Sequence, residues 1–192
     1  LMDDGVMGYV EIPKINVLLP IYHGTNADTL EIGVGHLLGS SLPVGGKNTH
    51  SVLTAHSGMA TDKMFSDLPQ MAEGDVFYLE IMGETLAYQV DQIRTVTPYD
   101  TTYLSTVAGE DLCTLVTCTP FGVNTHRLLV RGTRIPYEEA VEIQEEIEAV
   151  TEPASTWEQH YVRGILLGIG GSVFLLLLGY TLWKGWKKRH DH

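Results

Sequence analysis

The strongest constraint on the fold is a run of short alternating segments between residues 6 and 134. In "VEIPKINVLLPIY" the apolar residues recur mainly at alternate positions, and two prolines interrupt the pattern. A period of two is typical of strands with one buried face, and closely spaced strands separated by Gly and Pro favour one antiparallel β-barrel or sandwich. Helical patterns in this region are short and few. We therefore expect an all-β domain over residues 1–135.

Three stretches locate further strands. "VFYLEIMGETLAYQVDQI" predicts two strands joined at Gly83-Glu84, because glycine at the first central position suits a tight primed turn. "DLCTLVTC" and "HRLLVRGTRI" predict a second pair across a Gly-containing loop, and "SVLTAHSGM" begins as a short apolar strand.

The C-terminal part contains a long uncharged segment. Gly164 to Trp183, "GILLGIGGSVFLLLLGYTLW", has twenty residues without a charge, and a helix of that length covers about 30 Å, the thickness of the bilayer hydrocarbon. Arg163 stands alone before it, whereas Lys184, Lys187, Lys188 and Arg189 follow it. The positive-inside rule then predicts a transmembrane helix over 162–184 in the cell membrane, a basic cytoplasmic tail over 185–192, and an extracellular domain before the span.

The residues before the span are strongly acidic. The formal charge of the chain is −12, but the part before residue 163 has seven basic and twenty-three acidic residues, a net −16, which disfavours nucleic acid as a partner. Many of these acids lie in "YEEAVEIQEEIEAVTEPASTWEQ", where Ala140, Ile143, Ile147 and Val150 recur at helical spacing. We expect an acidic helical spacer over 136–161 whose helix ends near Pro153 and whose carboxylates face water.

Two cysteines, Cys113 and Cys118, lie in one predicted strand. A disulfide is the first alternative outside the cell, but in an extended strand the two residues are roughly 16 Å apart and point to opposite faces. They therefore cannot bond to each other, and no sequence feature supports an intermolecular bond. One thiol is expected to be a buried small side chain, and Cys118, at the strand end, is the candidate for reaction.

A reactive thiol needs a cationic partner and a general acid. Arg127 opens the next strand and would lie beside Cys118 if the two strands form a hairpin, although a surface arginine is the more common interpretation of such a residue. Six histidines precede the span without zinc-binding spacing, namely His23, His36, His50, His56, His126 and His160. Of these, His56 lies at a strand end beside Ser57-Gly58, where a site residue and a structural histidine are equally expected.

The motif "TLVTC" at 114–118 resembles the sortase signature Thr-Leu-x-Thr-Cys, and "TLVTCTPFGVNTHRLLVRG" at 114–132 is similar to the pilus-assembling class C branch. Segments similar to the same branch occur in the same order upstream: "GVMGYVEIPKINVLLPIYHGT", "GVGHLLGSSLPVGGKNTHSVLTAHSG", "MFSDL" and "GETLAYQVDQI". The resemblance covers nearly all of 5–135. It implies a closed eight-stranded sortase-type β-barrel with short helices, no metal or organic cofactor, and a catalytic set of His56, Cys118 and Arg127.

The resemblance also implies an activity. Cys118 would attack an LPxTG-like sorting signal between Thr and Gly, His56 would protonate the leaving amine, and Arg127 would hold the oxyanion. The acyl group of the resulting thioester would pass to a lysine amine of another pilin subunit. One alternative is a sortase that anchors surface proteins to cell-wall peptidoglycan, and another is a membrane-tethered binding module with an inactive site, which the intact catalytic set disfavours.

Two features depart from the class C pattern. The branch often has arginine after the catalytic histidine, and this chain has Ser57. The chain also starts at Leu1 without a signal segment or the Asp-Pro-aromatic lid motif of many pilus sortases, so we expect an N-terminal truncation.

Overall fold

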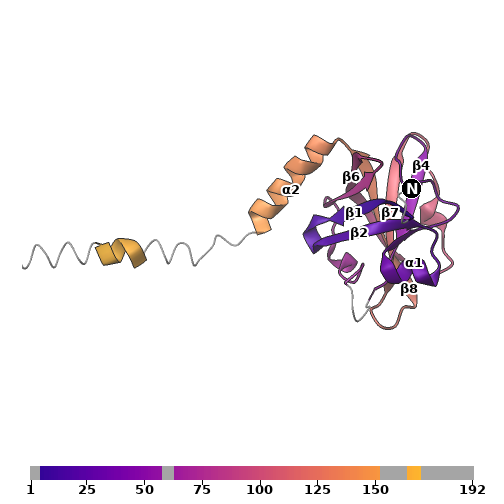
Figure 1. Ribbon diagram of the computed structural model, residues 1–192, viewed down its shortest axis with the longest axis horizontal. Helices are drawn as coiled ribbons and strands as arrows, with labels where there is room; N and C mark the ends of the chain where they lie inside the picture. The colour runs from indigo at the N-terminus through magenta and orange to yellow at the C-terminus, as the bar shows by residue number, and fades with distance from the viewer. Residues whose placement is uncertain (1–4, 58–62, 152–163, 170–192) are drawn as a thin grey trace, which may run out of the picture. The chain divides into compact units, whose positions relative to one another are not determined.

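The computed structural model describes residues 5–57, 63–151 and 164–169. The chain divides into two compact units, residues 1–147 and 148–192. In the first unit, eight strands form a closed barrel in the order β1-β2-β3-β4-β7-β8-β6-β5. Figure 1 shows this unit, with β1, β2, β4, β6, β7 and β8 labelled. The prediction of an eight-stranded barrel with short helices is therefore confirmed.

The strands are β1 (Val6–Ile12), β2 (Val17–His23), β3 (Val34–His36), β4 (Thr49–Thr54), β5 (Val76–Ile81), β6 (Glu84–Val96), β7 (Asp111–Thr119) and β8 (His126–Ile135). The helices are α1 (Ala27–Ile32), α2 (Tyr137–Thr151) and three 3-10 turns, η1 (Pro13–Ile15), η2 (Leu68–Gln70) and η3 (Thr102–Leu104). The Asn26 side chain accepts a hydrogen bond from the Thr29 N–H, which caps α1 at its N-terminus.

Two of the strand pairs are parallel, and here the expectation of an antiparallel barrel is wrong. β2 pairs with β3 in parallel, since α1 returns the chain to the start of the next strand. β4 pairs in parallel with β7 from Thr49↔Asp111 to Thr54↔Val116. The other six neighbouring pairs are antiparallel. The parallel β4–β7 pair places the C-terminal ends of two distant segments at the same end of the barrel.

β7 is buried on both faces. Cys113 and Leu115 belong to the main core inside the barrel. Val116, one position on, packs instead with Val52 and Leu129 in a second apolar cluster, which Leu37 and Leu104 partly cover. This alternation follows the pleat of the strand, and it separates the two cysteines as the sequence predicts.

The turn between β5 and β6 differs by one residue from its predicted position. Ile81 pairs with Glu84, so Met82 and Gly83 are the central residues. Both have positive φ angles, 52° and 84°, which is typical of a type I′ turn. Placing glycine first is the error, because this turn requires left-handed backbone at both positions.

The first turns of α2 pack on the barrel. Ala140 is fully buried against Val76, Tyr78 and Ala87, and the Tyr78 hydroxyl donates to Gln144 Oε1 at 2.8 Å. Of the predicted transmembrane helix over 162–184, residues 164–169 are helical, and the rest lies outside the described residues. Among the described residues, no helix has the length and apolar character needed to cross a membrane.

Candidate active site

The parallel ends of β4 and β7 bring His56 level with Cys118. Thr54 pairs with Val116 at the end of the ladder. Beyond it, the Ala55 N–H donates to Val116 O at 3.1 Å, and the Thr117 hydroxyl donates to Ala55 O at 2.9 Å. One further step along both segments reaches the predicted histidine and the predicted thiol, and both residues are partly exposed.

Ser57 adds a contact that sequence reasoning did not predict. Its hydroxyl donates to the backbone carbonyl of Cys118 at 2.8 Å. The carbonyl of His56 accepts a hydrogen bond from the Phe65 N–H at 3.1 Å. The only sequence signal was that Ser57 replaces the arginine often found at this position in the class C branch.

Arg127 lies across the β7–β8 hairpin from Cys118, and the two residues are partners in the antiparallel register. Directly opposed residues in such a pair have Cα atoms about 4.5–5.5 Å apart. The partly exposed guanidinium donates through Nη1 to Asn124 O at 3.1 Å and to His126 O at 2.9 Å. The structure therefore brings the three predicted residues to one end of the barrel.

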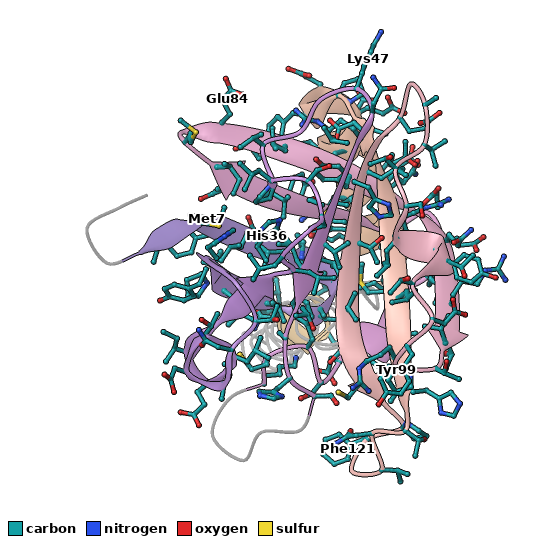
Figure 2. All side chains as sticks on the ribbon, turned by 90° about the vertical axis from the view of Figure 1, so that its right-hand side faces the viewer. Met7, His36, Lys47, Glu84, Tyr99 and Phe121 are labelled. Atoms are coloured by element: carbon teal, nitrogen blue, oxygen red, sulfur yellow. The ribbon has the colours of Figure 1, made fainter. Side chains whose placement is uncertain are left out.

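This end carries exposed aromatic residues. Phe121 follows β7 and is 70% exposed, and Tyr99 follows β6 and is 94% exposed. Both lie at the end of the barrel opposite Lys47 and Glu84 (Figure 2). The segments that flank the candidate site thus present apolar rings to solvent.

The two thiols have different environments, and both are free. Cys113 is fully buried, and burial raises the pKa of its thiol to about 12. Cys118 is partly exposed at the strand end. The prediction that the two side chains lie on opposite faces is confirmed, and accessibility favours Cys118 as the nucleophile.

Two other histidines are buried away from the thiol. His36 Nδ1 lies 3.2 Å from His23 Nδ1, and its Nε2 lies 2.9 Å from Ser41 O. His50 bridges Ser105 O at 2.9 Å and Thr114 Oγ1 at 2.7 Å. Burial lowers the pKa of both His36 and His50 below the ordinary value. These contacts fit a structural role.

His126 and His160 complete the set of candidate histidines. His126 pairs with Thr119, the residue after Cys118, and is exposed. By the alternation of the strand its side chain points away from the face of Arg127. His160 lies outside the described residues.

Comparison with known proteins identifies the family. The sortase domain model matches residues 10–135, more than half of the chain. The chain belongs to the sortase family. Sortase D of Bacillus subtilis (strain 168) is 34% identical to this sortase over 131 residues, which cover 67% of the chain and 63% of the relative. The chain thus spans less than two thirds of that relative's length.

Solved structures place this sortase with the class C branch. Sortase C-1 from Actinomyces oris is 57% identical, with a TM-score of 0.69 over 70% of this chain and 76% of that one. Sortase C1 from Streptococcus agalactiae is 56% identical, with a TM-score of 0.69 and 71% coverage of both chains. A Streptococcus pneumoniae sortase C structure, described as informative on catalysis and pilin substrate specificity, is 56% identical with a TM-score of 0.69, and covers 69% of this chain and 70% of that one.

Proposed function

We propose that this sortase is a cysteine transpeptidase that joins pilin subunits through an LPxTG-like sorting signal. The observation that carries the proposal is the convergence of three chain segments at one end of the barrel. Cys118 faces Arg127 in the β7–β8 register, and the segment of His56 is hydrogen-bonded to the Cys118 peptide through Ser57. A thiol, a general acid and a cationic donor are the groups that acyl transfer through a thioester requires.

In the first step, the Cys118 thiol passes its proton to His56, and Cys118 Sγ attacks the carbonyl carbon of the Thr residue in the sorting signal. The carbonyl oxygen becomes an oxyanion, and the Thr–Gly bond then breaks. The leaving glycine amine takes a proton from His56, and the Thr acyl group remains on sulfur as a thioester. The partial exposure of Cys118 leaves its sulfur accessible to a peptide.

Arg127 stabilises the oxyanion in this proposal. Its two described bonds both use Nη1, on the carbonyls of Asn124 and His126, so these backbone contacts anchor the guanidinium at the start of β8. Nη2 and Nε are the donors that we assign to the substrate. Donors fixed before the reaction stabilise developing charge without reorganisation at the moment of reaction.

In the second step, a lysine amine of another pilin subunit attacks the thioester carbon. The C–S bond breaks, the thiolate leaves, and His56 takes the proton from the attacking amine. The product is an isopeptide bond between two subunits. Sortase structures 51–57% identical to this chain are sortases C, and one of them is described as pilus-related, which supports a pilin as the acceptor.

We further propose that the chain is held in the cell membrane. Residues 162–184 would form the span, 185–192 a basic cytoplasmic tail, and 136–161 an acidic spacer that keeps the barrel outside the membrane. The uncharged run from Gly164 to Trp183 supports this arrangement. Membrane-held pilin substrates would then meet the barrel on the extracellular side.

A direct test uses the full chain in detergent with a pilin subunit that carries an LPxTG-like signal and an acceptor lysine. We expect covalent pilin oligomers, with isopeptide bonds located by mass spectrometry, and none with Cys118→Ala. Parallel reactions would contain a peptidoglycan-like amine in place of the pilin lysine. Products with that amine alone would reject the polymerase function in favour of wall anchoring.

A further inference from the structure

The structure assigns a positioning role to Ser57: its hydroxyl holds His56 in register with Cys118. The role rests on the proposed function, because it presupposes that His56 and Cys118 act as a catalytic pair. The main evidence for this role is the 2.8 Å hydrogen bond from Ser57 Oγ to Cys118 O. This bond joins the residue after the proposed general acid to the peptide of the proposed nucleophile.

The contact extends a ladder that the backbone alone does not complete. In a parallel pair, the N–H groups of alternate residues on one strand donate to alternate carbonyls on the other. The Ala55 N–H donates to Val116 O, and the next acceptor in the series is Cys118 O. The hydroxyl of Ser57 occupies that acceptor. On β7, the next backbone N–H in the alternating series of donors would belong to residue 120. That residue is Pro120, which has no N–H, so the ladder ends here.

The bond determines how firmly His56 is placed. On one side of His56, Ala55 is tied to β7 through Val116 and Thr117. On the other side, the Ser57 hydroxyl ties the chain to Cys118. Without the hydroxyl, the histidine would be anchored to β7 from its N-terminal side only. A displacement of about 1 Å between reacting groups can cost roughly a hundredfold in rate.

A short side chain suits this contact. Serine places its donor one bond from Cβ, within reach of a neighbouring backbone carbonyl. Short hydroxyl side chains commonly bond to nearby backbone groups. The Ser57 hydroxyl thereby contacts the peptide of the proposed nucleophile itself.

The first test measures turnover of a sorting-signal peptide by Ser57→Ala in the full chain. We expect kcat to fall by about tenfold or more, with KM within about threefold of the parent, because geometry and not substrate binding is disturbed. Ser57→Thr keeps the hydroxyl and should restore most of the rate. Thr49→Ala is the matched control, since Thr49 Oγ1 donates to Gly46 O at 2.6 Å at the other end of β4, and its kcat should stay within about threefold.

The second test separates positioning from a purely structural role and needs no sorting signal. The rate at which iodoacetamide alkylates Cys118 is measured against pH for the parent, Ser57→Ala, His56→Ala and the double variant. We expect Ser57→Ala to change the pH profile in the parent background but not in the His56→Ala background. A change of equal size in both backgrounds would mean that Ser57 acts on Cys118 directly, which overturns the assignment.

The remaining outcomes are equally decisive. Ser57→Ala with parental turnover, or with lowered turnover and an unchanged alkylation profile, would overturn the positioning role. Global unfolding of Ser57→Ala, seen as loss of the thermal transition, would mark the residue as structural and do the same. If instead His56→Ala leaves the alkylation profile of Cys118 unchanged, the catalytic pair itself fails, and with it the proposed function.

Discussion

Replacing Arg127 by lysine tests the proposed oxyanion site without changing the charge of the side chain. The guanidinium has five N–H donors in a fixed plane, and Nη1 already donates to the carbonyls of Asn124 and His126. A lysine has a single ammonium group on a flexible chain. It cannot keep both backbone carbonyls and reach the oxyanion beside Cys118 with separate donors, so one set of contacts must be lost.

The expected size of the effect follows from the loss of one oxyanion donor. Such a loss costs about 2.7–4 kcal/mol of transition-state stabilisation, or about 10²–10³ in kcat. Fold stability should change much less, because Arg127 is partly exposed and its bonds go to exposed backbone carbonyls at and just before the start of β8. We therefore expect a folded enzyme with at least a hundredfold lower kcat.

The assay is the first-turnover rate of thioester formation with a sorting-signal peptide. Arg131→Lys is the control on the same strand: Arg131 forms an ion pair with Asp91, with Nη2 2.6 Å from Oδ2, and its ammonium replacement retains the charge. Its rate should stay within about threefold of the parent. An Arg127→Lys rate in that same range would refute the oxyanion role and leave Arg127 as a surface strand residue.

Three further predictions concern the barrel. Burial raises the pKa of the Cys113 thiol to about 12, so at pH 7.5 this thiol stays protonated as well as inaccessible. Iodoacetamide should therefore label Cys118 far faster, and comparable labelling by peptide mapping would reject our choice of nucleophile. Burial lowers the pKa of His50, so below about pH 6.5 the unfolded chain binds more protons than the folded one. Tm should therefore fall from pH 7 to pH 5. The His50→Gln variant should show a smaller fall of Tm over the same range. A Cβ at Gly132 would lie 2.7 Å from Phe77 Cε1. Gly132→Ala should therefore lower the free energy of unfolding, measured by urea titration, by about 1–3 kcal/mol. An unchanged urea midpoint would show that the Phe77 ring moves aside.

Local patterns predicted much of the fold and the placement of the two cysteines. Alternation located β7 and β8 together with their hairpin, and strand parity separated Cys113 from Cys118. Both inferences need only a period of two and a short connection, which are local properties of the chain. The resemblance to sortases then added His56, for which spacing alone left a structural histidine equally expected.

The rest depends on contacts between segments distant in sequence. No local pattern distinguishes a strand that will pair in parallel, so the β2–β3 and β4–β7 pairs were not expected. β3 has only three residues and follows a one-and-a-half-turn helix, too short for either period to be evident. The Ser57 contact spans 61 positions of sequence, and a serine beside a glycine indicates only a turn.

The parallel pair also accounts for the place of the site. Parallel strands end at the same edge of a sheet, so His56–Ser57, just after the end of β4, lie beside Cys118–Thr119, the last residues of β7. The antiparallel β8 then begins where β7 ends and adds Arg127 to the same edge. An antiparallel β4–β7 pair with the same residues would place His56 at the opposite end of the barrel from Cys118, about 20 Å away for six-residue strands. Strand direction, which local sequence does not specify, is therefore what assembles the candidate catalytic set.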